Sequence, residues 1–260
     1  MIKEQNNILI FAFAGFYLAI VFTLTAIFSG LGTRWALWDF RTGLKIFRWA
    51  VYAEMIAFVI TLVLCILTVN KQSKPAFTLS IIGFLISISV LSIALKWMYT
   101  AKSVPAIHDI TTDIENPPEF DMILKLRKDA PNPPEYGGKQ ISSQQIKAYP
   151  DIKPTIIKLI KIDAYELCLA IAKEMNWEIV NTKQNEGFIE ATDRTFWFGF
   201  KDDIVIRITP FDNSSRIDLS SVSRVGRSDI GTNAKRIQKF LKKLENKIPR
   251  SKLRLLFILL

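Results

Sequence analysis

The chain has 260 residues, of which half are hydrophobic, with a mean hydropathy of +0.22 and a formal net charge of +10. This length allows one or two domains, and the hydropathy is high for a protein that is soluble throughout. The single histidine excludes a multi-histidine metal site, and the two cysteines fall in separate segments where we expect no disulfide. CxxC, HExxH, GxGxxG and Walker-type patterns are absent from the sequence, so we predict no metal and no cofactor.

Three long apolar runs occupy the first 100 residues. They cover residues 8–28, 49–69 and 76–95, and Glu54 is the only charged residue within them. Each run matches the length that a helix needs to cross a hydrocarbon core of ~30 Å. A cleaved signal peptide is the alternative for the first run, but the apolar stretch of a signal peptide has only ~7–15 residues. We predict a three-helix transmembrane region over residues 1–100, with the lipid bilayer as a partner.

Prolines dominate the next segment. Eight of the eleven prolines fall between Pro105 and Pro154. Proline removes a backbone donor and restricts the preceding residue to extended conformations. We therefore predict an extended, semi-rigid arm over residues 101–154 that lies over another part of the chain.

From about residue 155 the pattern predicts a small α+β domain. Asp163 and Glu166 have the spacing of a capping box before an amphipathic helix, and a second such helix begins near Ile230. Between them lie the strand-like runs WEIVNT, GFIEAT, TFWFGF, DIVIRI and SRIDLSS. Contiguous strands with short turns predict an antiparallel sheet of four to five strands with the two helices on one face. This domain covers residues 155–248, and a basic-apolar tail, too short to span a membrane, covers 249–260.

The hairpin that contains DIVIRI and RIDLSS allows its register to be predicted. With the turn centred between Asp212 and Asn213, apolar residues face apolar residues, and a slip by one position would set them against charged ones. The predicted pairs are Ile206 with Leu219, Ile208 with Ile217, and Arg207 with Asp218. The Arg–Asp pair is either a structural contact contributing ~0.2–1 kcal/mol or part of a binding groove.

The stretch SRVGRSDIGTNAKRI, residues 223–237, connects the last strand to the last helix. Its Ser228 or Asp229 would cap that helix, which accounts for part of the pattern. Arg224 and Arg227 beside a helix N-terminus also suit an anion, such as a phosphate, a carboxylate or a lipid headgroup. The acidic arm itself, with Asp109, Asp113 and Glu115, is another occupant. The candidate binding residues are His108, Asp109, Asp113, Arg194, Arg207, Asp218, Ser223, Arg224, Arg227, Asp229 and Asn233.

These residues leave three hypotheses of different classes. The first is a membrane-anchored binding or assembly module that holds an anionic lipid, a small anion or a protein partner in an arginine-lined groove. The second is an accessory subunit of a larger membrane complex, indicated by Glu54, because ionisable residues within spans usually face other protein. The third is an enzyme in which His108 acts with Asp113, Asp193 or Asp218. Charges of both signs are mixed beyond residue 100, so we expect no nucleic-acid partner.

Five separated motifs occur in a specific order between residues 104 and 244. They are PAIHDITTDIENPPEF, YPDIKP, NWEIV, IEATDRTFWFGFKDDIVIRI and SSVSRVGRSDIGTNAKRIQKFL. In this part the chain resembles the domain-of-unknown-function 1499 family of bacteria and plastids, and its three spans are similar to those of the multi-span bacterial members. The resemblance implies the boundaries, the fold and an extracytoplasmic domain, but no established activity.

The basic residues give conflicting predictions for membrane orientation. If the amino terminus were outside, six basic residues would face the cytoplasm: Arg34, Arg41, Lys45, Arg48, Lys96 and Lys102. Three would face outward: Lys3, Lys71 and Lys74. This count favours a cytoplasmic domain. Four of the six lie in the tryptophan-rich first loop, where headgroups explain them, and without that loop the count slightly reverses. With the family resemblance, we predict a bacterial inner-membrane protein with its amino terminus inside and residues 100–260 in the periplasm.

Overall fold

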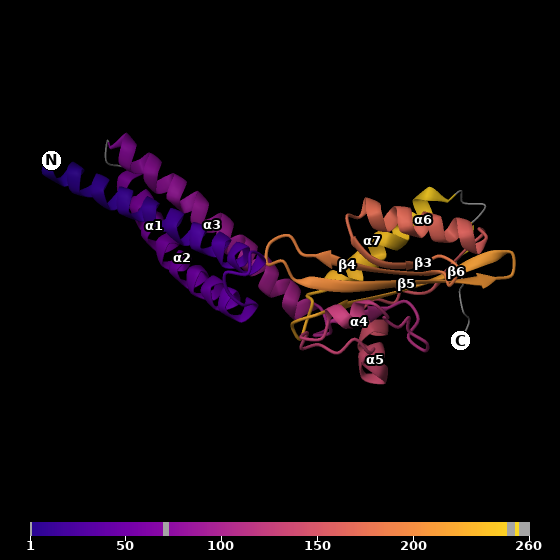
Figure 1. Cartoon of the computed structure of the whole chain (residues 1–260). Coiled ribbons are helices and arrows are strands. Elements are labelled where there is room, and N and C mark those ends of the chain that lie inside the picture. Colours follow the sequence, from indigo (N-terminus) through magenta and orange to yellow (C-terminus); the bar gives the residue numbers. More distant parts are fainter. Residues whose placement is uncertain (1, 70–72, 249–252, 255–260) are drawn as a thin grey trace. The chain divides into compact units, whose positions relative to one another are not determined.

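A computed structural model describes residues 2–69, 73–248 and 253–254. The chain forms two compact units. The first comprises Met1–Thr100 together with Phe196–Gly199, and the second comprises Ala101–Thr195 together with Phe200–Leu260. Each unit has its own architecture and is described separately (Figure 1).

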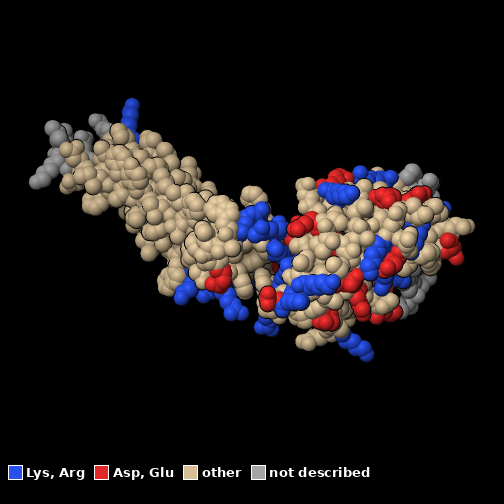
Figure 2. Space-filling view, viewed as in Figure 1, with Lys and Arg blue, Asp and Glu red and all other residues tan. Residues whose placement is uncertain are grey.

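The first unit contains three long apolar helices. They are α1 (Ile2–Arg34), α2 (Phe40–Val69) and α3 (Lys74–Ser103). Each is long and apolar enough to cross a membrane, which confirms the prediction of three candidate spans. On the face drawn in Figure 2 these helices carry few charged residues, whereas the sheet domain carries both signs interspersed.

Small residues bring α1 and α2 together. Ala12, Ala19 and Ala26 of α1 are buried. A Cβ atom added to Gly15 would lie only 3.2 Å from Cδ1 of Leu64 on α2. Small side chains at an interface between membrane helices allow the two backbones to approach closely. This packing supplies van der Waals contacts, because no hydrophobic effect drives helices together within lipid.

The second unit is built on one antiparallel sheet. Its strands are β1 (Asp109–Thr111), β2 (Thr155–Ile157), β3 (Glu178–Lys183), β4 (Phe188–Arg194), β5 (Lys201–Phe211), β6 (Ser214–Ser223) and β7 (Leu253–Arg254). The order is β3-β4-β5-β6-β2-β7, and β1 also pairs with β6. The antiparallel sheet is confirmed. It has seven strands over the described residues where four to five were predicted, because β1, β2 and β7 have only two or three residues and no detectable periodicity.

The predicted register of the β5–β6 hairpin is confirmed. Ile206 pairs with Leu219, Ile208 with Ile217, and Arg207 with Asp218. The run TFWFGF, in contrast, was wrongly predicted as a strand. It forms the turn between β4 and β5, in which the Thr195 hydroxyl accepts the Phe200 amide at 2.8 Å and Gly199 adopts a φ of +68°.

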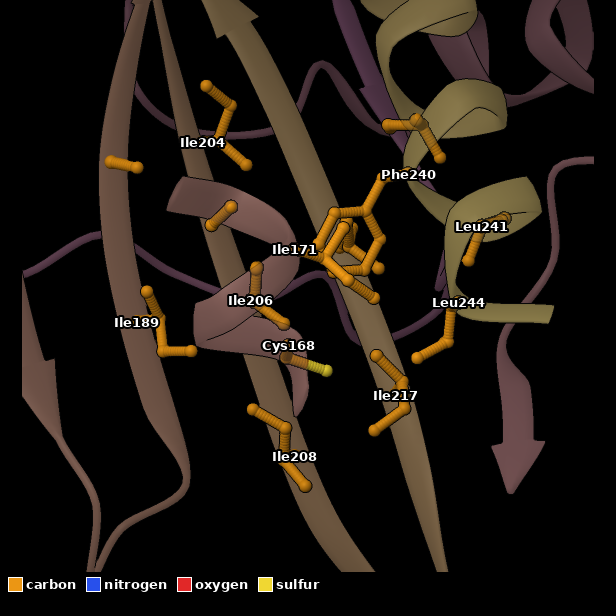
Figure 3. Packing of buried hydrophobic residues seen from close by; sticks show 14 of the residues in the cluster. Cys168, Ile171, Ile189, Ile204, Ile206, Ile208, Ile217, Phe240, Leu241 and Leu244 are labelled. Carbon is orange, nitrogen blue, oxygen red and sulfur yellow. The ribbon is translucent and has the colours of Figure 1, made fainter. Parts of the chain in front are cut away.

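Two helices cover one face of the sheet, as predicted. They are α6 (Lys161–Glu174) and α7 (Thr232–Lys247), and Figure 1 shows both on the same side of the strands. Figure 3 shows Ile206 and Ile217 of the sheet beside Cys168, Ile171 and Phe240 of the helices, within one buried cluster. The periodic apolar faces of the helices thus meet the inward face of the strands.

The predicted capping box of α6 is wrong. The helix begins at Lys161, after Ile160 at its N-cap, so Asp163 lies within the first turn. An acidic residue in that position still interacts favourably with the positive end of the helix dipole.

The proline-rich arm covers the opposite face of the sheet, where Figure 1 places α4 and α5. Its extended character is wrong in part, because α4 (Ile123–Leu126) and α5 (Gly138–Ala148) are helical. No proline interrupts residues 135–149, so the helix-breaking effect applies only on either side of α5. Gln145 of α5 is buried and exchanges hydrogen bonds with the backbone of Thr111 on β1, at 3.0 and 2.6 Å. Of the predicted tail 249–260, only Leu253–Arg254 lie within the described residues, and Lys71 also lies outside them.

Candidate functional site

Three buried carboxylates mark the face of the sheet that the arm covers. Glu190 on β4, Asp203 on β5 and Asp218 on β6 are exposed by 0%, 0% and 1%. A buried carboxylate requires hydrogen bonds or a counter-charge, because an unpaired buried charge is costly. The arm contributes to the interactions around all three, so these carboxylates connect the sheet to the arm.

Asp203 binds two arginines that are far apart in sequence. Arg127 of the arm donates from Nη1 to Oδ2 at 2.8 Å. Arg224, directly after β6, donates from Nε to Oδ2 and from Nη2 to Oδ1, both at 2.8 Å. Thr192 adds a hydrogen bond to Oδ1 at 2.7 Å. Arg224, which the sequence indicated for an anion pocket, therefore holds a carboxylate of its own chain.

A second cluster joins Asp113 of the arm to the β5–β6 hairpin. Asp113 Oδ2 accepts from Arg207 Nη2 at 3.0 Å and from Arg216 Nη2 at 2.6 Å. Asp218 accepts from the same two arginines, at 3.2 and 3.1 Å. Burial raises the pKa of Asp218, and the two arginines oppose that rise. Two positive and two negative charges thus neutralise one another within this cluster.

The candidate residues predicted from the sequence omitted four members of this face, namely Arg127, Glu190, Asp203 and Arg216. Arg216 stands two positions before Asp218 on β6, and the alternation of a strand places both on one side. Glu190 accepts the backbone amides of Asp121, Met122 and Ile123 at 2.7–3.2 Å, at the start of α4. The signal for Glu190 is an acidic residue between the apolar Ile189 and Ala191 of a strand.

The loop between β6 and α7, residues 224–231, is held in place by the arm. Asn132 Nδ2 donates to the carbonyl oxygens of Ser223 and Gly226, both at 2.9 Å. Gly226 has a φ of +91°, and Ile230 has a φ of +53°. A left-handed conformation is costly for a β-branched residue and persists only where the surroundings impose it. The loop is therefore rigid and strained at Ile230.

Asp229 satisfies the amino-terminal amides of α7. Its Oδ1 accepts the Gly231 amide at 2.8 Å and its Oδ2 accepts the Asn233 amide at 2.7 Å. Ser228 Oγ accepts the Ile230 amide at 3.2 Å. Burial raises the pKa of Asp229, and its hydrogen bonds with Asn233 and Gly231 oppose this rise. The predicted N-cap at Ser228 or Asp229 is wrong in position, because Gly231 is the N-cap residue and α7 begins at Thr232. Asp229 nevertheless accepts the amides of Gly231 and Asn233.

Ser223 and Asn233 lie on the α7 side of the sheet, away from Arg224. Asn233 Nδ2 donates to Ser223 Oγ and to the His108 carbonyl, both at 2.9 Å. Arg236 of α7 bonds to Asp202 at 2.6 Å in the same region. The sheet therefore separates residues that the sequence placed in one groove.

The carboxylates predicted to assist His108 are each paired with an arginine. Asp113 and Asp218 pair with arginines of the hairpin, and Asp193 pairs with Arg236 at 2.8 Å. Burial lowers the pKa of His108, and a hydrogen bond with the backbone of Arg227 opposes that effect.

Asp109 is the most unusual group beneath the arm. It is 3% exposed, and neither carboxylate oxygen has a hydrogen-bond partner that satisfies ordinary geometry. The Nε of Arg127 is likewise buried without a partner. Burial raises the pKa of Asp109 to about 7, while the Gly137 amide and the charge of Arg127 act in the opposite direction.

Arg194 and Arg227 lie at the surface of the second unit. Both side chains are exposed. Arg227 forms no ion pair with any residue that the structure describes. Within those same residues, no three His, Cys, Asp or Glu side chains are grouped closely enough to hold a metal ion.

The comparisons with known proteins place this domain in a family. A search of curated proteins found no match to the chain. The model of the family described as "Protein of unknown function (DUF1499)" matches residues 109–244, from the first residue of β1 to Leu244 in α7. This region contains most of the arm, strands β1 to β6, α6 and most of α7, and it amounts to more than half of the chain. The protein therefore belongs to the DUF1499 family, with three candidate membrane helices preceding the family domain.

Proposed function

We propose that the protein is a membrane-anchored binding or assembly module that holds an anionic group of a lipid or protein partner at Arg227. The observation that carries this proposal is an exposed arginine on a strained loop that the arm fixes in position. Backbone strain concentrates at functional sites, where it holds a side chain ready for its partner. Because the backbone of the loop is held in place, little backbone freedom is lost when Arg227 binds a phosphate or carboxylate.

Two other predicted arginines already bind carboxylates of their own chain, which leaves Arg227 as the candidate for an external anion. Arg224 is bonded to Asp203, and Arg207 is bonded to Asp113 and Asp218. An external anion would have to displace these internal carboxylates from buried positions, which costs several kcal/mol. Arg227 could bind an external anion without displacing an internal carboxylate. Of the arginine-lined groove predicted from the sequence, the proposal therefore retains only the surface around the 224–231 loop.

Replacement of Arg227 tests this function directly. The full-length chain is purified from its host membranes in mild detergent, and bound lipids and proteins are identified by native mass spectrometry. We expect Arg227→Gln to weaken retention of an anionic species at least about tenfold, because a hydrogen bond to a charged group contributes about 1.5–3 kcal/mol. Lys239→Gln, which removes one exposed positive charge from α7, is the matched control and should retain the species.

Equal retention by wild type, Arg227→Gln and Lys239→Gln would contradict the assignment, as would the absence of any bound anion. A stoichiometric protein that stays bound to Arg227→Gln would instead favour the accessory-subunit hypothesis. The enzyme hypothesis has less support, because the carboxylates predicted to assist His108 are engaged by arginines.

The proposal places residues 100–260 outside the cytoplasm of a bacterial cell, with the amino terminus inside. Alkaline phosphatase fused after residue 248 should be active, because this enzyme forms its disulfides only in an oxidising compartment. Green fluorescent protein fused at the same position should be dark. The reverse pair of results would place the domain in the cytoplasm, in agreement with the simple count of basic residues.

A further inference from the structure

Glu54 lies near the middle of α2, within a candidate membrane span. Its side chain is fully buried at 0% exposure by neighbouring parts of the first unit. It forms no ion pair with any residue that the structure describes. The sequence suggested that Glu54 faces another protein, but the helices of its own chain enclose it.

Polar side chains from the two other helices surround this carboxyl group. Thr23 of α1 places its hydroxyl oxygen 3.5 Å from Oε2 of Glu54. Ser87 of α3, also at 0% exposure, lies beside the carboxyl group. Oε1 of Glu54 and Oγ of Ser87 are both buried and both lack a hydrogen-bond partner with ordinary geometry. Two unpartnered oxygens therefore occur together, where hydrocarbon makes each of them costly.

The surroundings of Glu54 favour its neutral form. The Ser87 and Thr23 hydroxyls can each donate to a carboxyl oxygen, but neither of them supplies the positive charge that an ionised carboxylate would need here. An ionised carboxylate without a counter-charge is also expensive inside a membrane, and such groups mark proton relays or ion pathways.

We propose that Glu54 is a proton-binding site within the membrane. Its neutral carboxyl group lies with Oε1 beside Ser87 and accepts at Oε2 from Thr23. The bound proton thereby joins α1, α2 and α3 through one side chain. Its release leaves a bare charge among apolar helices, so the packing of the three helices depends on whether the site is occupied. This role is independent of any ligand at Arg227.

Infrared spectroscopy of the full-length protein in nanodiscs of zwitterionic lipid tests the proposal. At neutral pH we expect the carbonyl band of a protonated carboxyl group in the wild type. Subtraction of the spectrum of Glu54→Gln should isolate this band, because the amide keeps the size and hydrogen-bonding capacity of the side chain. Asp109→Asn is the control for the buried carboxyl group of the second unit and should retain the Glu54 band.

Reaction with a membrane-soluble carbodiimide provides a second measurement. The oxygen of a protonated carboxyl group adds to the central carbon of the reagent, the proton moves to one of its nitrogens, and rearrangement gives a stable acylurea with no leaving group. Mass spectrometry should find one adduct on the peptide that contains Glu54. Its rate should fall as the pH rises through deprotonation of the site.

The outcomes distinguish a protonated Glu54 from an ionised Glu54 and from a site that binds a metal cation. The band alone, or the band with the adduct, supports the proposal. Absence of the band at neutral pH overturns it. If sodium ions at constant pH abolish the band, the site binds a metal cation in preference to a proton, and the proposal is also overturned.

Discussion

Replacing Asp203 with alanine should destabilise the second unit by about 3–5 kcal/mol, because removal of one partner of a buried ion pair leaves an uncompensated charge. The side chain of Asp203 is fully buried, and that of Arg127 is only 2% exposed. Arg224, at 13% exposure, would lose both of its bonds to the carboxylate. Alanine therefore leaves two guanidinium groups and the Thr192 hydroxyl without their acceptor.

Hydrogen exchange of the full-length protein in detergent measures this effect. Amides of β5 and β6 should exchange faster in Asp203→Ala by the factor that corresponds to the lost free energy. Asp203→Asn, which keeps the shape and one acceptor oxygen, should lose less. Asp129→Ala removes an exposed carboxylate of the arm and is the control. Equal protection in Asp203→Ala and in the control would show that the arginines find other partners.

Asp109→Asn should stabilise the second unit, and the gain should increase with pH. The pKa of Asp109 is raised by burial from 3.8 in the unfolded chain to about 7 in the folded one. Between these values the folded state holds a proton that the unfolded state has released, so the wild type loses stability as the pH rises. Each pKa unit corresponds to about 1.4 kcal/mol, which gives a ceiling of about 4 kcal/mol above pH 7. The asparagine variant has no such proton to lose.

Thermal unfolding at several pH values provides the comparison. The melting temperatures of wild type and Asp109→Asn should agree near pH 3, diverge from pH 4 to pH 7, and differ by a constant amount above that. Asp129→Asn controls for the loss of one negative charge from the arm. A difference that does not change with pH would mean that Asp109 is ionised in the folded protein and has a partner there.

The β5–β6 hairpin shows why part of this fold could be predicted from the sequence. A strand has a side-chain period of two, so a slip of one residue would expose every isoleucine and bury Arg207. The partners are close in sequence, and the turn fixes their alignment. The three spans are equally predictable, because length and apolar composition alone determine them.

The pairing across the arm could not be predicted in the same way. Arg127 and Asp203 are 76 positions apart, and no local period relates them. The sequence correctly indicated that the acidic arm would meet arginines, and Asp113 does so. It assigned those contacts to Arg224 and Arg227, whereas Arg207 and Arg216 make them. Many arginines and carboxylates have complementary charges, so charge alone does not determine which of them pair. The path of the backbone determines which ones come within bonding distance.

The attachment of the arm to β6 determines the order in which the domain can assemble. The Thr112 amide donates to the carbonyl oxygen of Leu219, which lies 107 positions later. Strands β3 to β6 are joined by short turns, and such local pairings form faster than distant ones. We therefore expect the sheet of β3 to β6 to form first and the arm to close over it. Until the arm has closed, Ile107 and Ile110 are exposed to solvent. Charged residues next to exposed apolar residues oppose aggregation. We expect Asp109 and Asp113 to oppose aggregation of the chain until the arm has closed.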